Sequence, residues 1–208
     1  MTRDEYIDLH TDIEPDYLER INRKTHLLLV NPRMISGHFQ GRFLSMIAKM
    51  QNPLRILELG TFTGYSALCL AEALPENGML HTIEHNDELE DLIRENFDES
   101  GIAHKITLHI GDALEIIPTL DEQFDLVFID ADKREYIAYY DAVFDKLRSG
   151  GVVLADNTLW SDKVLEPAHP NDKQTIELLR FNDYVTNDSR VEKIIVPLRD
   201  GLTMIRKK

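Results

Sequence analysis

Cysteine is almost missing from this sequence, which has only Cys69 among its 208 residues. A single cysteine excludes an intrachain disulfide, and we expect a reducing compartment. The first twenty residues, MTRDEYIDLHTDIEPDYLER, lack the apolar core of a signal peptide. No apolar run in the chain reaches the length needed to span a membrane. We therefore predict an unexported, cytoplasmic protein.

Positive charge is also scarce. The chain has 23 Lys and Arg against 37 Asp and Glu, a formal net charge of −14. Non-specific binding to nucleic acid or to an anionic membrane needs a positive surface. This balance argues against both partners.

Repeats, low-complexity tracts and Pro/Gly/Ser linkers are absent as well. A hydrophobic content of 43% with 29% charged residues is typical of a globular domain with a sizeable core. We predict one domain over residues 1–208, with an N-terminal helical segment (1–50) and a core (51–208).

The residue pattern changes at the boundary between these two parts. Residues 14–30 and 37–51 have helical apolar spacing, the second with a stripe of Phe39, Phe43, Met46, Ile47 and Met50. Beyond it, predicted strands alternate with predicted helices; the strands are 54–60, 79–85, 105–111, 124–130 and 152–156, and the helices are 64–74, 86–101, 112–120 and 134–151.

The chain ends differently, with two strand-like runs, 191–198 and 202–206, on either side of the turn signal RDG. Alternating strands and helices predict parallel βαβ units covered on both faces. We therefore predict an α/β fold: a Rossmann-like, doubly wound, seven-stranded and mostly parallel sheet. It should carry a C-terminal antiparallel hairpin and extra N-terminal helices.

Ligands of such sheets bind outside the carboxyl ends of the strands. The stretch ELGTFTGYS (58–66) lies there, where Gly60 and Gly64 allow a tight turn close to a ligand. Taken alone, a glycine pair is weak evidence, because an ordinary tight βα turn would also use it. However, the next two predicted strands lead into Glu84, which could accept ribose hydroxyls, and into Asp112. Together they favour an adenosine-containing ligand.

The dinucleotide fingerprint G-x-G-x-x-G and the P-loop motif are both absent. The acid Glu58 would repel a pyrophosphate, but it suits the positive charges of S-adenosylmethionine. The sequence thus favours S-adenosylmethionine over a dinucleotide.

A second group of polar residues follows two further predicted strands. Asp130 ends one, and Asp156 with Asn157 ends the next. Two carboxylates and a carboxamide are hard oxygen ligands suited to Mg²⁺, Mn²⁺ or Ca²⁺. A single Asp at such a place is more often a helix cap or a solvated loop residue, but the three together favour a metal site.

Three stretches, ILELGTFTGYSALCLAEAL, FDLVFIDADKREY and LADNTLW, resemble motifs of the cation-dependent O-methyltransferases, which include caffeoyl-CoA and catechol enzymes. The resemblance runs from PRMISGHFQG to LRDGLTMIRKK, most of the chain. The DADK form is similar to the caffeoyl-CoA and bacterial branch, whereas the catechol enzymes carry His-Trp where Ala131 and Asp132 stand here.

The resemblance implies a role for each matching position. Lys133 would be the catalytic lysine and Glu84 would hold the cofactor ribose. Asp130, Asp156 and Asn157 would be the metal ligands, with Asp130 also beside the cofactor. The remaining cofactor positions are Glu58, Gly60, Tyr65 and Ser66 in the loop that holds the methionine part, Met34 and Ser36 from the N-terminal segment, and Asp112 with Ala113 at the adenine.

We therefore predict an S-adenosylmethionine-dependent and divalent-cation-dependent O-methyltransferase, with Mg²⁺ as the first choice of metal and a small catechol-like acceptor. Lys133 would take the proton of the reacting hydroxyl, which requires metal charge and burial to lower its pKa. Taken alone, Lys133 would more often be a surface lysine paired with Asp132. We expect Trp160 and the loop 160–172 to cover the acceptor.

Two further questions stay open at the level of sequence. The enzyme could methylate another small nucleophile or a macromolecule, and a non-catalytic cofactor-binding protein is a more distant alternative. The N-terminal helices could form a wall of the acceptor site or a dimer surface, and the resemblance implies a homodimer.

Overall fold

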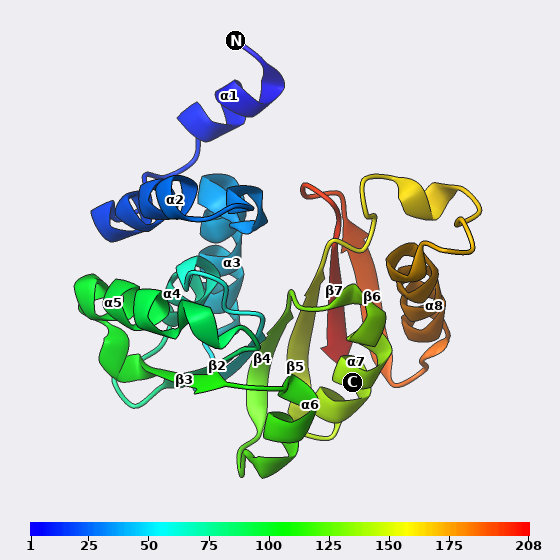
Figure 1. The fold of residues 1–208 in the computed structure, drawn as a ribbon. Helices are drawn as coiled ribbons and strands as arrows, with labels where there is room; N and C mark the ends of the chain where they lie inside the picture. The colour runs from blue at the N-terminus through cyan, green and yellow to red at the C-terminus, as the bar shows by residue number, and fades with distance from the viewer.

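Five short apolar runs form the centre of the molecule as parallel strands. The computed structural model describes residues 1–208, apart from the side chain of Asp4. It contains a seven-stranded sheet of order β3-β2-β1-β4-β5-β7-β6 (Figure 1). The strands are β1 (Arg55–Leu59), β2 (Met79–Glu84), β3 (Ile106–Ile110), β4 (Phe124–Ile129), β5 (Leu147–Asp156), β6 (Val191–Val196) and β7 (Leu202–Lys207).

The strands β1 to β5 pair in parallel, whereas β7 is antiparallel to both β5 and β6. The predicted parallel sheet with a C-terminal hairpin is thus confirmed. Because β1 lies between β2 and β4, the chain moves outward in both directions from the centre of the sheet. Ligand crevices of open α/β sheets form at such a reversal of strand order.

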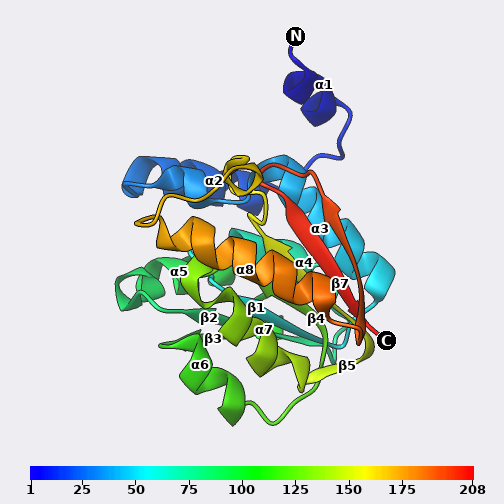
Figure 2. The ribbon, with the colours of Figure 1, turned by 90° about the vertical axis from the view of Figure 1, so that its right-hand side faces the viewer.

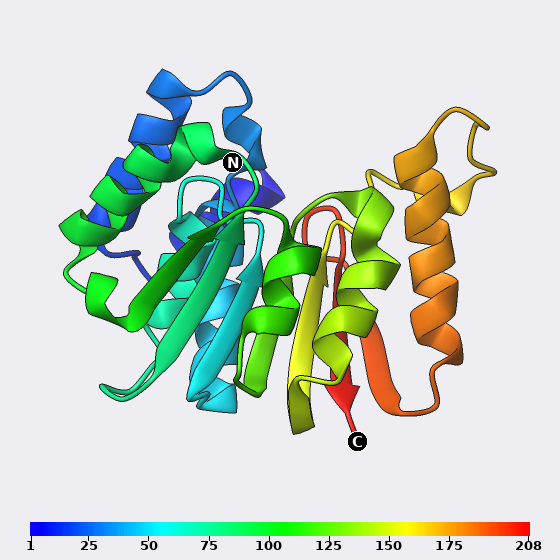
Figure 3. The same ribbon diagram turned by 60° about the horizontal axis from the view of Figure 1, so that its bottom comes forward.

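Helices cover both faces of the sheet (Figures 1 and 3). Successive strand residues point to opposite faces, so Ile56 belongs to one core cluster while Leu57 and Leu59 belong to the other. The helices are α1 (Arg3–Leu9), α2 (Asp16–Leu28), α3 (Gly37–Gln51), α4 (Tyr65–Ala71), α5 (Glu90–Ser100), α6 (Ala113–Ile116), α7 (Tyr136–Phe144) and α8 (Lys173–Asn187). The first cluster includes buried residues of α2, α3, α4 and α5, and the second those of α6, α7 and α8.

Helix α3 is packed through small residues. A Cβ atom on Gly41 would lie 2.7 Å from Cε1 of Tyr65 and 2.8 Å from Sγ of Cys69, so only glycine permits this contact with α4. The apolar stripe noted in the sequence lies elsewhere on the helix, since Met46 is 58% and Met50 68% exposed. Only Phe43 and Ile47 of this stripe pack against the core of the chain, and Phe39, Met46 and Met50 are left exposed.

Helix α1 extends away from the rest of the molecule (Figures 1 and 2). Its N-terminus carries a capping box, in which Thr2 accepts from the backbone of Glu5 and Glu5 accepts from the backbone of Thr2. No helix of the described residues is long and apolar enough to cross a membrane.

Two features of the second half of the chain differ from the sequence prediction. The helix expected over residues 134–151 ends at Phe144, because Leu147 already pairs with Phe124 across a register shift in the sheet. Helix α8 was not predicted from the sequence. Its signals were present: Asp172 caps the helix, and Leu178, Phe181 and Val185 are buried at helical spacing.

Candidate active site

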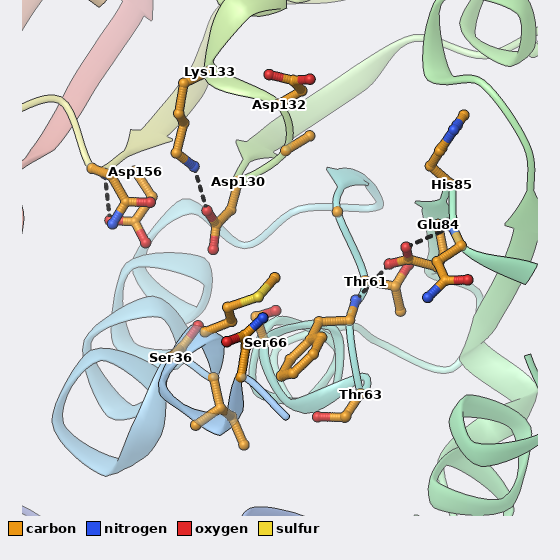
Figure 4. A pocket seen from close by; sticks show the side chains of 18 of the residues that line it. Ser36, Thr61, Thr63, Ser66, Glu84, His85, Asp130, Asp132, Lys133 and Asp156 are labelled. Atoms are coloured by element: carbon orange, nitrogen blue, oxygen red, sulfur yellow. Dashed lines mark hydrogen bonds and ion pairs between the residues drawn. The ribbon is translucent and has the colours of Figure 1, made fainter. Parts of the chain in front are cut away.

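A pocket of about 1210 Å³ opens at the carboxyl ends of β1, β2, β4 and β5 (Figure 4). The βα loops form its base, and residues 29–36 of the N-terminal segment line it as well. The pocket collects most of the residues singled out in the sequence. Those that line it are Met34, Ser36, Gly60, Tyr65, Ser66, Glu84, Asp112, Ala113, Asp130, Lys133, Asp156 and Asn157.

The backbone of the loop after β1 requires glycine at position 60. Its φ of +93° favours glycine, and an added Cβ would lie only 2.1 Å from the carbonyl oxygen of Asp130. The loop after β1 therefore lies directly against the end of β4. This close approach joins the glycine loop to the carboxylate end of the pocket.

Glu84 is held at the pocket by two backbone amides. One carboxylate oxygen accepts from the amide of Phe62 at 2.7 Å, and the other accepts from the amide of Asn86 at 2.9 Å. A carboxylate has about four lone-pair positions, so each oxygen can accept a further hydrogen bond. Glu84 thus has a fixed orientation and free acceptor capacity.

Glu58 lies behind the pocket wall and does not line it. It is fully buried within β1, and its Oε2 accepts from the Thr82 hydroxyl at 2.5 Å. Burial raises the pKa of Glu58 to about 8, and hydrogen bonding by Thr82 and Ser66 offsets part of that shift. The residue expected to face the methionine part of a cofactor is therefore separated from the pocket surface.

Residues of α6 and of the N-terminal segment line the pocket on either side of the glycine loop. On the β3 side, Asp112 caps α6 by accepting from the amide of Leu114 at 2.8 Å, and Ala113 lies beside it. On the N-terminal side, Met34 is 60% exposed, whereas Ser36 is buried. The ring of Tyr65 lines the pocket, but its hydroxyl donates to the carboxylate of Glu14.

The other end of the pocket contains the residues of the predicted metal site. Ile129 pairs with Ala155, so Asp130, directly after β4, and Asp156, the last residue of β5, lie at the same level of the sheet. Asp156 is 3% exposed, and its Oδ1 accepts from the amide of Asn157 at 2.8 Å. Asn157 has a φ of +59°, a left-handed conformation that asparagine tolerates better than most residues. Figure 4 shows Asp130 and Asp156 projecting toward the same part of the pocket.

Lys133 belongs to this group as well. Its Nζ donates to Oδ1 of Asp130 at 2.8 Å and to the hydroxyl of Tyr136 at 2.8 Å. The side chain is buried, and Asp132 instead pairs with Arg134 at 2.9 Å. The alternative of a surface lysine paired with Asp132 is therefore wrong.

Burial and the Asp130 carboxylate shift the pKa of Asp156 in the same direction, whereas they shift the pKa of Lys133 in opposite directions. Burial, and then the nearby Asp130 carboxylate, raise the pKa of Asp156 to about 6. Burial lowers the pKa of Lys133, but the Asp130 carboxylate and the Tyr136 hydroxyl outweigh burial and raise that pKa above its ordinary value. The expected lowering of the Lys133 pKa is not produced by the described residues, which form an ion pair.

Sequence reasoning missed two residues of the site. Gln40 of α3 donates from Nε2 to Oδ2 of Asp156 at 2.7 Å, and its Oε1 accepts from Nη1 of Arg199 at 2.9 Å. These contacts join positions 116 and 159 residues apart. No local pattern in the sequence could indicate them.

The loop after Asn157 is conformationally unusual. Trp160, Ser161 and Asp162 have φ values of +50°, +52° and +61°, and Trp160 lines the pocket. Successive non-glycine residues in this region are strained, and such strain is concentrated at functional sites. The expected covering role of residues 160–172 stays a prediction.

Among the described side chains, no group of three or more His, Cys, Asp and Glu is placed to hold a metal ion. The predicted set has two carboxylates, so Asn157 would have to contribute its amide oxygen.

The open α/β sheet has its pocket at the reversal of strand order, with a fixed acid at the end of β2 and a carboxylate–lysine group after β4. These features are typical of Rossmann-like enzymes that bind a cofactor containing a nucleoside. The chain belongs to the O-methyltransferase family, whose profile matches residues 8–208. The predicted family, fold and enzyme class are thereby confirmed.

Known relatives match nearly the whole chain in sequence and in structure. The sequence is 32% identical to caffeoyl-CoA O-methyltransferase 1 of Arabidopsis thaliana, over 96% of this chain and 82% of that protein. The structure is similar to that of TomG from Streptomyces achromogenes, an O-methyltransferase of tomaymycin synthesis solved in complex with SAM. The TM-score is 0.90, with 32% identity and 100% of both chains covered. SAH-bound PaMTH1 of Podospora anserina has a TM-score of 0.91 at 27% identity, covering 99% of this chain and 93% of that one.

Proposed function

We propose that this chain transfers a methyl group from S-adenosylmethionine to a hydroxyl of a small vicinal diphenol, with the help of a divalent cation. One observation carries the proposal. A single pocket has the fixed Glu84 carboxylate on one side, and Asp130, Asp156 and Lys133 on the other. The two ends match the needs of a nucleoside cofactor and of a phenolic acceptor.

The residues around Glu84 fit S-adenosylmethionine. Glu84 keeps free acceptor positions for ribose hydroxyls, Asp112 and Ala113 line the adenine side, and Met34 with Ser36 lines the opposite wall. When bound, the cofactor supplies an electrophilic methyl group. TomG and PaMTH1, which were solved with SAM and SAH, support this assignment.

The residues around Asp156 fit a divalent cation, Mg²⁺ first, with Mn²⁺ or Ca²⁺ as alternatives. Asp130 raises the pKa of Asp156, so the two carboxylates repel each other and a positive charge between them would relieve the repulsion. Asp130, Asp156 and Asn157 would hold the ion through oxygen atoms. When bound, the cation supplies the positive charge that stabilises an ionised phenol.

We assign Lys133 to accept the proton of the reacting hydroxyl, a role that needs its neutral amine. The contacts with Asp130 and Tyr136 favour the ammonium, so the charge of a bound cation would have to lower the pKa of Lys133. Lys133 is buried beside Asp130, and Tyr136 holds its ammonium from the other side. Its Nζ therefore has a fixed place next to the proposed metal ligands. Holding acceptor and donor together in one pocket supplies much of the rate acceleration, because proximity removes an entropic cost.

The acceptor should enter beside Trp160, from the side of the loop 160–172. Relatives named caffeoyl-CoA O-methyltransferase support a phenolic acceptor. Another small nucleophile or a macromolecule would need no Asp130–Asp156–Asn157 set, so metal dependence separates these alternatives.

The test is methyl transfer to a panel of catechols, flavonoids and hydroxycinnamoyl thioesters, with and without EDTA. We expect activity on a vicinal diphenol to disappear with EDTA and to return with Mg²⁺ or Mn²⁺. Asp156→Ala should abolish this rescue while titration calorimetry still detects S-adenosylhomocysteine binding, because the cofactor contacts lie mainly on the loops after β1, β2 and β3. Full activity in EDTA would refute the metal assignment.

A further inference from the structure

Gln40 connects three distant parts of the chain. It lies in the first turns of α3 and is 1% exposed. Its amide nitrogen contacts Asp156 at the end of β5, and its amide oxygen contacts Arg199 in the turn between β6 and β7. A buried polar side chain with two such partners is costly to place unless both hydrogen bonds form.

Arg199 determines which way the Gln40 amide points. A guanidinium only donates hydrogen bonds, so the amide oxygen must face Arg199 and the amide nitrogen must face Asp156. The same nitrogen of Arg199, Nη1, also donates to the carbonyl oxygen of Ile35 at 3.2 Å and to that of Ser36. Arg199 therefore holds both Gln40 and the segment that carries Ser36 into the pocket.

The contact from Gln40 completes a fixed orientation for Asp156. One carboxylate oxygen accepts from Gln40 and the other accepts from the amide of Asn157. Each oxygen then keeps further lone-pair capacity, and the plane of the carboxylate cannot rotate freely. Because glutamine is neutral, it orients Asp156 without adding a third negative charge beside Asp130.

We propose that Gln40 is a positioning residue for Asp156 and that Arg199 fixes the Gln40 amide for this purpose. The inference rests on the proposed function, since it takes Asp156 to be a metal ligand. Hydrogen bonds that orient a metal ligand typically affect metal affinity by about 10–100-fold when they are removed. Arg199 also supports Ile35 and Ser36, so it joins the metal end of the pocket to the cofactor wall.

Gln40→Met tests the proposal, because methionine keeps the length of the side chain and loses both hydrogen bonds. We expect calorimetry to give an Mn²⁺ dissociation constant roughly 10–100-fold higher than that of the wild type. Binding of S-adenosylhomocysteine, measured without metal, should change by less than about threefold. The matched control is Gln51→Met on the same helix, where the amide donates only to the carbonyl oxygen of Gly150 at 3.2 Å. The control should bind Mn²⁺ like the wild type.

Arg199→Met is a second test of the proposal. Because Arg199 is exposed, its replacement leaves no cavity in the core. It should weaken Mn²⁺ binding in the same direction and also weaken S-adenosylhomocysteine binding. In the double variant the two losses of Mn²⁺ affinity should not add, because both act through one contact to Asp156. Additive losses would overturn the role assigned to Arg199.

Wild-type Mn²⁺ affinity in a folded Gln40→Met protein would overturn the role of Gln40 and leave the proposed function intact. A wild-type protein with no Mn²⁺ binding that Asp156→Ala can remove would instead refute the metal assignment, and the positioning role with it. Thermal unfolding of each variant shows whether a loss of affinity reflects a loss of fold.

Discussion

Single residues define the chemistry of this pocket, and Lys133 is the most informative of them. Its burial, its contact with Asp130 and its contact with Tyr136 distinguish it from the solvated lysines of the surface. A lysine in that place is consistent with a role in handling the acceptor proton. The metal ligands and the cofactor loop would remain in place without it.

We expect Lys133→Ala to keep S-adenosylhomocysteine binding and to reduce turnover of a vicinal diphenol by about 10²–10⁴-fold, the usual contribution of a general base. The deficit should shrink as the pH rises, because the phenol then ionises without help. Steady-state rates between pH 7 and 9.5 measure both effects. Lys105→Ala is the control, since Lys105 is also partly buried and paired, with Glu76 at 3.1 Å. Normal turnover of Lys133→Ala at neutral pH would refute the catalytic role.

The buried Glu58 should make the stability of the fold depend on pH. Its pKa of about 8 in the folded protein lies above the ordinary value of 4.5, so the folded protein keeps a proton that the unfolded chain releases. The contribution of Glu58 to the free energy of unfolding is therefore greatest below about pH 4.5, and it is lost as the pH rises through about 8.

We expect Glu58→Gln, without ligand, to gain stability relative to the wild type between pH 5.5 and 8.5. Urea unfolding at several pH values measures the difference. The exposed Glu88→Gln should show no such trend. A constant difference between Glu58→Gln and the wild type across this range would contradict the raised pKa.

At the scale of elements, the loop between β1 and α4 is closely confined by its neighbours. It connects a buried strand to a buried helix, and Gly60 brings it against the backbone of Asp130. The geometry of the glycine loop and that of the carboxylate end are therefore linked through the backbone. A change in the loop should affect both.

We expect Gly60→Ala to destabilise the fold more than Gly101→Ala, by roughly 1–3 kcal/mol as for other overpacked sites. Both glycines have positive φ, but a Cβ on Gly101 would have no atom within 4 Å, whereas one on Gly60 would lie 2.1 Å from the Asp130 carbonyl oxygen. Urea denaturation of the two variants separates backbone strain from the clash. Equal losses would show that the clash relaxes at no cost.

At the scale of the whole molecule, several apolar side chains of α3 remain exposed to solvent in the single chain. On α3, Phe39, Met46 and Met50 are 37%, 58% and 68% exposed, and α1 extends beyond the rest of the chain. An exposed apolar stripe of this kind is typical of an association surface. The predicted homodimer would bury it.

We expect light scattering to give twice the mass of one chain, and Met46→Glu to shift this value toward one chain at micromolar concentration. The control is Ile194→Glu on the edge strand β6, where Ile194 is 63% exposed. A wild-type mass of one chain would refute the dimer, and dissociation by Ile194→Glu alone would move the interface to β6.

The sequence by itself determined the alternation of five parallel strands with helices, the C-terminal strand pair and the edge of the sheet at which the pocket forms. Apolar runs and glycine turns are local signals, and parallel strands necessarily bring their carboxyl ends to one edge. This is why the sequence alone is enough to group Glu84, Asp112, Asp130 and Asp156. The missed helix α8 also had local signals, so its omission was an error of interpretation.

Only the tertiary structure decided which face of α3 is buried, that Glu58 lies behind the wall, and that Lys133 pairs with Asp130 and not with Asp132. It alone brought Gln40 and Arg199 to Asp156. Periodicity records the conformation of neighbouring residues, whereas these contacts depend on how α3 and the β6–β7 turn pack against the sheet. The close packing that Gly41 permits between α3 and α4 helps to set that arrangement, and no spacing along the chain encodes its result.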